Sequence, residues 1–257
     1  MEIVIISIVA FITAMLTFFS GFGLGTILTP VFILFFPVDL AIGLTGVVHF
    51  FNNVFKLLLV GKNANKEVVI RFGIPAVAAA VVGAWLLLKI TDLQPLFSYE
   101  LFDKNFEVST VKFIISILLI IFAVMDLIPF FNTIKIKKSQ LPLGGVLSGF
   151  FGGLSGNQGA LRTAFLIKSG LTKNAFIGTA VVVSTFVDFT RLSVYATRYV
   201  KADLSENLPV VVAATLAAIT GAFIGNKLLK KVTLRFVQIV VAITLIMLSL
   251  ALGAGFI

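Results

Sequence analysis

Residues 41–56 read AIGLTGVVHFFNNVFK, and residues 176–191, 135 positions later, read FIGTAVVVSTFVDFTR. Both segments are rich in Val and Phe, and both carry polar side chains at matching positions. These positions are His49, Asn53 and Lys56 in the first segment and Ser184, Asp188 and Arg191 in the second. Internal repeats of this kind are common in membrane transporters, where the substrate site forms between the two halves. The two segments therefore predict a duplicated transport protein.

The composition is that of an integral membrane protein. Of the 257 residues, 59% are hydrophobic and 12% are charged, whereas a soluble domain has about 25% charged residues. A transmembrane helix needs about 20 consecutive apolar residues. Uncharged runs of at least that length occur at residues 3–38, 141–161, 207–226 and 236–257. The connecting loops are too short for a soluble domain, so we expect a single multi-pass membrane domain in contact with the lipid bilayer.

Charge and cysteine content exclude several classes of protein. The net charge is +9, but most Lys and Arg fall in short loops, which indicates membrane orientation rather than nucleic-acid binding. There is no cysteine, which excludes disulfides, thiolate catalysis and cysteine-ligated metals. No metal-binding or nucleophile–base motif occurs, so we expect neither an enzyme nor a cofactor. Met1-Glu2-Ile3 lacks the basic start of a cleavable signal peptide, and the first apolar segment is expected to be retained.

The charges between the apolar runs predict which loops are cytoplasmic. Loops 61–71, 132–140 and 227–235 are basic, and the positive-inside rule assigns them to the cytoplasm. Loops 92–107 and 198–206 are acidic or balanced, and we expect them outside. Under the 135-residue offset, an inward loop of one half corresponds to an outward loop of the other. The two halves are therefore expected to have inverted topologies.

We expect an all-α polytopic membrane protein made of two inverted repeats, residues 1–135 and 136–257. A Gly-rich apolar stretch begins each repeat, at 3–36 and 141–170, and the first is too long for one crossing. Each stretch is expected to return to its own side, as a broken pair of short helices or as a re-entrant hairpin. The first alternative, which we favour, gives ten short crossings with both termini outside; the second gives six crossings. The three plain crossings per repeat are at about 40–60, 72–90 and 111–131, and at about 175–197, 207–228 and 236–256.

Glycines interrupt both hairpins at their expected turns. Residues 20–30 read SGFGLGTILTP, and residues 152–162 read GGLSGNQGALR. Non-helical backbone at membrane depth must be buried or line an aqueous cavity, and amides at a restarting helix can bind an anion. Close helix packing is the alternative role of a glycine. The glycines whose amides we expect to replace part of an anion's hydration are Gly23, Gly25, Gly156 and Gly159.

Polar side chains complete the candidate site. An ionised group at mid-bilayer costs at least ~2.5–3.5 kcal/mol, so it faces protein or water and usually has a function. Asp188 or His49 is expected to carry a coupling proton, because histidine titrates near neutral pH. The side chains expected to contact the substrate are Arg162, Asn157, Gln158, Asn52, Asn53, Ser184, Arg191 and Lys56.

Several of these residues also have a structural alternative. Lys56 could extend its ammonium group to the cytoplasmic interface. Arg191 could only neutralise Asp188, three residues earlier, and His49 could be a hydrogen-bonded interior residue. Taken together, however, the candidate interior holds Arg162, Arg191, Lys56 and His49 against the single acid Asp188. That balance favours an anionic substrate, since the guanidinium fork suits planar or tetrahedral oxyanions.

The glycine clusters resemble those of a known family. Ser20-Gly21-Phe22-Gly23-Leu24-Gly25 with Pro30, and Leu147-Ser148-Gly149-Phe150-Phe151-Gly152-Gly153, are similar to the two Gly-rich copies of the sulfite exporter TauE/SafE family. The resemblance extends over nearly the whole chain and implies a bacterial or archaeal inner-membrane permease for sulfite, sulfonates or related sulfur oxyanions. The second copy departs from the family pattern, because Asn157-Gln158 and Arg162 add polar groups where Gly and Pro are usual.

These features predict a secondary transporter for a small oxyanion, with sulfite as the expected substrate and a proton as the expected coupling ion. A passive anion channel is the alternative. An ATP-driven pump is not expected, because the chain lacks a phosphate-binding Gly-x4-Gly-Lys-Ser/Thr motif. An intramembrane enzyme and a non-transporting membrane subunit are less favoured. The direction of transport and a homodimeric assembly stay open.

Overall fold

The computed structural model describes residues 1–18, 23–128, 137–199, 206–228 and 234–256. The Ser20–Phe22 part of the first glycine cluster lies outside these residues. So do most of the basic loop at 132–140 and parts of the loops at 198–206 and 227–235.

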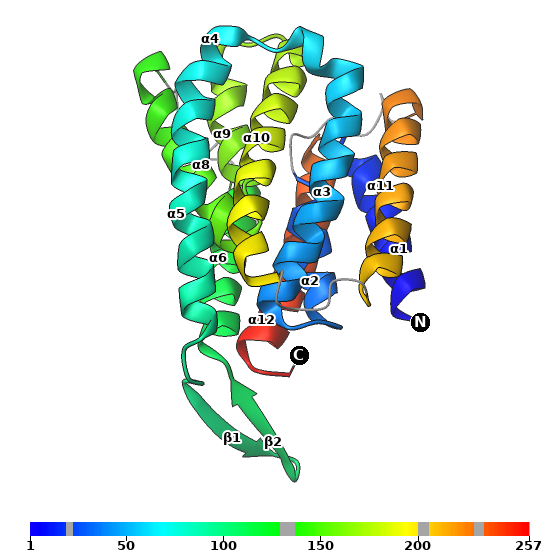
Figure 1. The fold of residues 1–257 in the computed structure, drawn as a ribbon, viewed down its shortest axis with the longest axis vertical. Helices are drawn as coiled ribbons and strands as arrows, with labels where there is room; N and C mark the ends of the chain where they lie inside the picture. Colours follow the sequence, from blue (N-terminus) through cyan, green and yellow to red (C-terminus); the bar gives the residue numbers. More distant parts are fainter. Residues whose placement is uncertain (19–22, 129–136, 200–205, 229–233, 257) are drawn as a thin grey trace.

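Helices make up most of the described chain, and their order is the same in both halves (Figure 1). Each half has one helix, a break, a short helix, a long helix and two further helices. The first half contains α1 (Glu2–Thr17), α2 (Gly25–Ile33), α3 (Val38–Val60), α5 (Ile74–Thr91) and α6 (Thr110–Leu127). The second contains α8 (Leu141–Ser155), α9 (Gly159–Leu166), α10 (Lys173–Tyr199), α11 (Leu208–Leu228) and α12 (Leu234–Gly253).

Short elements connect these helices. Between α3 and α5 lie a 3-10 turn (Gly61–Asn63), α4 (Lys66–Val68) and a π-helical turn (Val69–Gly73). A 3-10 turn (Lys138–Gln140) precedes α8, and another (Ile167–Ser169) follows α9.

Both Gly-rich stretches form two short helices separated by a break, as the sequence led us to expect. In the second hairpin the break is Gly156–Gln158, and Gly156 ends α8 with φ of 75°. A left-handed residue of this kind commonly ends a helix, and glycine adopts it without steric cost. The amides at the start of α9 therefore begin in the interior of the protein rather than at its surface.

The helices have the length and hydropathy of membrane spans. Among the described residues, four helical segments are long and apolar enough to cross a bilayer: Val38–Asn63, Lys66–Thr91, Lys173–Arg198 and Leu208–Lys227. Shorter apolar helices cover Glu2–Thr17, Thr110–Met125 and Ile239–Gly253. Many large apolar side chains on these helices face outward, such as Leu58, Phe189 and Leu216. This is the distribution expected of a protein surrounded by lipid.

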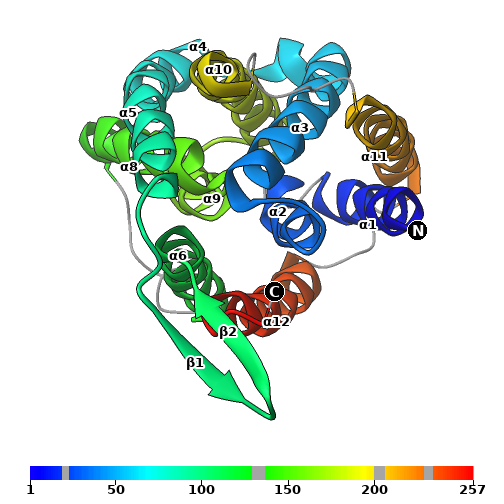
Figure 2. The same cartoon turned by 60° about the horizontal axis from the view of Figure 1, so that its bottom comes forward.

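The helices pack in pairs that join the two halves. α5 lies along α8, α1 along α11, α6 along α12, and α3 along α10 (Figures 1 and 2). In Figure 1, α3 rises from the lower end of the bundle and α10 descends from the upper end, while α5 descends and α11 rises. α3 and α10 thus run in opposite directions, and so do α5 and α11.

Small residues allow two of these pairs to approach closely. A Cβ atom added to Gly149 or Gly153 on α8 would collide with the backbone carbonyl of Ala76 or Ala80 on α5. Gly221 on α11 meets the carbonyl of Phe11 on α1 in the same way. For these glycines, close helix packing is the role that the structure supports.

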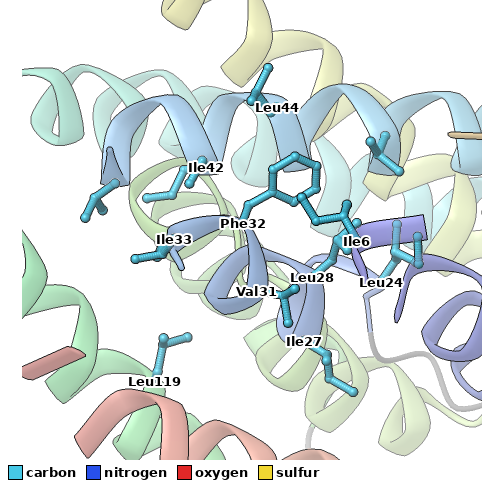
Figure 3. Close-up of a cluster of buried hydrophobic side chains, with 14 of the residues drawn as sticks. Ile6, Leu24, Ile27, Leu28, Val31, Phe32, Ile33, Ile42, Leu44 and Leu119 are labelled. Carbon is cyan, nitrogen blue, oxygen red and sulfur yellow. The ribbon is translucent and has the colours of Figure 1, made fainter. Parts of the chain in front are cut away.

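An apolar cluster holds α2 in the centre of the bundle (Figure 3). Leu28 and Phe32 of α2 are fully buried, as are Ile42 on α3 and Ile6 on α1. Burial of such side chains stabilises a fold through packing even where lipid replaces water. The cluster fixes the position of Gly25, at the start of α2, relative to α3.

A β-hairpin corrects the expectation of an all-α chain. Strands β1 (Phe97–Leu101) and β2 (Lys104–Val108) pair antiparallel within the loop that was expected to be external. The Tyr99 hydroxyl donates to the Ala254 carbonyl at 2.6 Å, and Phe106 packs edge-on against Phe256 with ring centroids 5.1 Å apart. One aromatic residue from each strand, Tyr99 and Phe106, thus anchors the hairpin next to the end of α12, beyond the lower end of the bundle (Figure 1).

Candidate functional site

The polar residues predicted from the repeat meet at the contact between α3 and α10. His49, Asn53 and Lys56 on α3 are at most 5% exposed. Ser184, Asp188 and Arg191 on α10 are at most 1% exposed. The break between α8 and α9 adds Asn157 and Gln158, and α9 adds Arg162 at 3% exposed. We refer to these nine residues as the polar site.

The carboxylate of Asp188 is at the centre of the polar site. Its Oδ2 lies 2.6 Å from His49 Nδ1 and accepts a hydrogen bond from Asn53 Nδ2 at 2.8 Å. Its Oδ1 accepts from Gln158 Nε2 at 3.2 Å and from Arg191 Nε at 3.0 Å. Arg191 Nη2 is also 2.9 Å from Oδ1. Residues from α3, α10 and the second helix break therefore converge on one carboxylate.

The contact with Asp188 fixes the orientation of the His49 ring. An ionised carboxylate can only accept hydrogen bonds, so an ionised Asp188 requires a hydrogen on His49 Nδ1. His49 Nε2 then faces the first helix break, 3.0 Å from where a Cβ atom at Gly23 would lie. A side chain at Gly23 would displace the imidazole, which explains why glycine is needed at this point of the chain.

A second group of polar atoms lines a small cavity beside the carboxylate. Arg162 Nη1 donates to Ser184 Oγ, and the ammonium group of Lys56 lies 5.4 Å from the centre of the Phe18 ring. The cavity is lined by Thr17, Phe18, Gly23, His49, Asn53, Lys56, Arg162, Ile177, Ala180, Val181 and Ser184. It measures about 20 Å³, which is room for roughly one water molecule.

The two helix breaks touch each other at the polar site. A Cβ atom at Gly25 would lie 3.1 Å from the Gly156 carbonyl oxygen, and Thr26 Oγ1 donates to Asn157 Oδ1 at 3.1 Å. A Cβ atom at Gly156 would in turn lie 3.0 Å from Arg191 Nη1. The starts of α2 and α9, residues Gly25 and Gly159, are thus brought close to the charged side chains.

The structure bears on two of the alternatives that the sequence left open. Lys56 is 5% exposed and its ammonium group lies over Phe18, which does not fit extension to an interface. Arg191 pairs with Asp188, as its structural alternative expects, and it also lies close to Gly156 in the second break. Both side chains belong to the polar site.

Asn52, also predicted to contact the substrate, is fully buried. It does not line the cavity, and neither do Asn157, Gln158, Asp188 and Arg191 of the polar site. What sets Asn52 apart, among the described residues, is the lack of a hydrogen bond from its side chain. Within the described part of the chain, neither its amide nitrogen nor its amide oxygen has a hydrogen-bond partner.

Sequence reasoning missed three residues that contribute to the site. Phe18 covers Lys56, Thr26 donates to Asn157, and Ser148 Oγ donates to the Gln158 carbonyl at 3.1 Å. Thr26 follows the first glycine cluster directly, and Ser148 lies inside the second. Their position in the helix hairpins was the signal that could have identified them. Phe18 gave no such signal, because Phe is abundant along the whole chain.

The formal charges of the buried site do not balance. Arg162, Arg191 and Lys56 carry three positive charges against one negative charge on Asp188, and His49 adds another when protonated. Among the described residues, no carboxylate forms an ion pair with Lys56. A buried surplus of positive charge is costly unless an anion compensates for it.

Comparison with known proteins gives the family of this chain. A model of the family described as "Sulfite exporter TauE/SafE" matches residues 6–252. No curated protein and no solved structure matched the chain. The matched range contains every residue of the polar site and extends from within α1 to within α12. The chain therefore belongs to the sulfite exporter TauE/SafE family, and it is a membrane transporter rather than an enzyme.

Proposed function

We propose that this protein is a secondary transporter that moves sulfite, or a related sulfur oxyanion or organosulfonate, across the cytoplasmic membrane. The observation that supports this proposal most directly is the surplus of buried positive charge in the polar site. An oxyanion would compensate for that charge and would accept hydrogen bonds from the same side chains.

The cavity residues have the chemistry to bind such an anion. Arg162 offers a guanidinium group, Lys56 an ammonium group, and Ser184 a hydroxyl group, and all three line the cavity. Backbone amides at the starts of α2 and α9 add further donors, because the first amides of a helix have no partner within it. Gly25 and Gly159 let an anion approach these amides without contact with a side chain.

The small size of the cavity favours a carrier over a channel. About 20 Å³ holds one water molecule, and a sulfur oxyanion is several times larger. The cavity in the described conformation is smaller than the substrate, so we propose that the helices move to admit it. A passive anion channel, our second candidate, would need a continuous open path in its conducting state.

Two inverted repeats, residues 1–135 and 136–257, would supply that movement within one membrane domain. The equivalent helices run in opposite directions (Figure 1), and α5–α8 and α1–α11 form matching contacts between the halves. In transporters with this symmetry, one unit rocks against the other around a central site. We propose ten short crossings with both termini outside; six crossings with two re-entrant hairpins remain the alternative. A homodimer is compatible with either.

The pair formed by His49 and Asp188 is our candidate for proton coupling. The two side chains are 2.6 Å apart and fully buried beside the cavity. A histidine and a carboxylate in direct contact can share and release a proton near neutral pH. If His49→Gln keeps uptake driven by a pH gradient, the proton is not carried by this histidine.

Reconstitution of the purified protein in liposomes tests the proposal. Vesicles are loaded in turn with sulfite, sulfate, thiosulfate or an organosulfonate, with and without a pH gradient, and flux is measured. We expect saturable flux of a sulfur oxyanion, accelerated by the same anion on the opposite side. Unsaturable conductance driven by voltage would favour the channel instead, and no flux of any of these anions would refute the proposed substrate class.

A further inference from the structure

We infer that the Asp188 carboxylate occupies the binding position of the transported oxyanion, so that the anion binds there together with a proton that neutralises Asp188. This inference rests on the proposed function and adds the location of the anion and the direction in which the proton moves. Proton and anion would cross the membrane in the same direction.

The first step is the donor set around Asp188. Four side chains direct N–H groups at it: His49 and Asn53 toward Oδ2, and Gln158 and Arg191 toward Oδ1. A sulfur oxyanion also presents oxygens that share one central atom and accept hydrogen bonds from charged or amide donors, so the same arrangement would bind it. The carboxylate thus uses the donors that an oxyanion substrate requires.

The second step is electrostatic. Two anions cannot share one buried donor set, since like charges in close contact are strongly unfavourable in a low-dielectric interior. A proton on Asp188 removes its charge and turns one of its oxygens into a donor. The four donors then become available to the oxyanion, and the neutral acid can donate a hydrogen bond to it.

The third step concerns the groups around the carboxylate. His49 and Lys56 face this region from α3, Arg162 from α9, and Arg191 and Tyr195 from α10. Asp188 is the single buried acid among the described residues of the site. The groups that surround Asp188 are positive or neutral, so they attract an anion to the site once Asp188 is neutral. When no anion is present, the same positive groups compensate for the charge of an ionised Asp188.

A binding experiment with the full-length purified protein tests this coupling. Sulfate and methanesulfonate are the probes, because their own charge does not change between about pH 5 and 8. Wild-type protein should bind the effective probe up to about tenfold more tightly for each unit by which the pH falls. Asp188→Asn, which imitates the neutral acid, should bind it at least as tightly at pH 8 as the wild type does at low pH. Its affinity should depend on pH less steeply than that of the wild type, because the proton on Asp188 no longer contributes, although His49 and Lys56 still face the site.

Asp39→Asn is the matched control. Asp39 is an acid at the start of α3 and pairs with Arg198 outside the polar site. This variant should keep the pH dependence of the wild type. If Asp188→Asn binds no anion while Asp39→Asn binds normally, or if Asp188→Asn keeps the wild-type pH dependence, the inference is wrong.

Flux through the wild-type protein gives a second test that does not depend on the stability of a variant. Proteoliposomes are monitored for anion and proton movement together, and one proton should accompany each anion in the same direction. Anion flux without protons, or with protons moving in the opposite direction, would overturn this inference and leave the proposed function standing. Failure of the wild type to move any sulfur oxyanion would instead refute the proposed function.

Discussion

Replacement of Lys56 by methionine separates a binding role for its charge from a structural one. Lys56 is 5% exposed, and its ammonium group lies 5.4 Å from the centre of the Phe18 ring. If the ammonium group of Lys56 stabilises the fold, its removal should lower the melting temperature. If the ammonium group instead serves to bind an anion, it destabilises the protein while no anion is bound, and its removal should raise the melting temperature. The variant Lys56→Met keeps the length and apolar stem of the side chain and removes only the ammonium group.

The size of the effect follows from the burial and contacts of Lys56. A charged side chain at membrane depth costs about 2.5–3.5 kcal/mol, and the contact with Phe18 recovers about 0.5–2 kcal/mol. Lys56→Met should therefore stabilise the empty protein by about 0.5–3 kcal/mol. At about 2–4 °C per kcal/mol for a chain of this size, the melting temperature should rise by about 1–12 °C.

The same substitution should weaken anion binding. A hydrogen bond to a charged group contributes about 1.5–3 kcal/mol, which corresponds to a loss of affinity of about 10- to 100-fold. Thermal unfolding in detergent and the half-saturating anion concentration in proteoliposomes measure the two effects. Lys89→Met is the matched control, because Lys89 also lies near an aromatic ring, Trp85, but on the exposed side of α5. A less stable Lys56→Met, or one with wild-type affinity, would refute the reasoning.

Two further results are expected. Gly149→Ala should destabilise the protein by about 1–3 kcal/mol, because the new Cβ atom would collide with the Ala76 carbonyl. Gly73→Ala is the control and should have little effect on thermal unfolding, because the nearest atom to its Cβ would be at an ordinary 3.4 Å. Equal effects of the two substitutions would contradict the proposed packing of α8 against α5. The ion pair between Arg198 and Asp39, at 3.2 Å, joins the ends of α10 and α3. In a double-mutant cycle, Arg198→Gln and Asp39→Asn should therefore show a coupling of about 0.5–1 kcal/mol in the free energy of unfolding. Strictly additive effects would show that the pair contributes nothing to stability.

The polar site could be predicted from the sequence because of its spacing. His49, Asn53 and Lys56 repeat every three to four residues, and so do Ser184, Asp188 and Arg191, which places each set on one helical face. Their matching positions in the repeat then indicated that the two faces meet. The structure brings these six residues together, whereas the side chain of Asn52, one position from Asn53, forms no hydrogen bond among the described residues.

Other features depended on contacts that spacing does not reveal. The partner of each charge could not be predicted, because Asp188 is bound by residues 30 and 139 positions away as well as by its helix neighbour Arg191. The role of the glycines varied in the same way. Gly149 packs against α5, whereas Gly23 makes room for His49, although both lie in apolar Gly-rich segments.

The β-hairpin shows a different limit of sequence analysis. Its strands are five residues each, and the charges among them suggested only an external loop. Alternating Phe97, Tyr99 and Phe106 were compatible with strands, but a short hairpin is stable only when it packs on something else. That support comes from Phe256 and the Ala254 carbonyl, about 150 residues further along the chain.

Counterflow through Arg162→Ala tests the central claim, that a sulfur oxyanion crosses the membrane through the buried cationic site. Proteoliposomes loaded with unlabelled sulfite are given labelled sulfite outside, and its uptake is followed for the wild type and the variant. Arg162 lines the cavity and is 3% exposed, so we expect rapid wild-type counterflow and none above protein-free vesicles for Arg162→Ala, with nearly unchanged expression and melting temperature. Counterflow at the wild-type rate in Arg162→Ala would contradict the account.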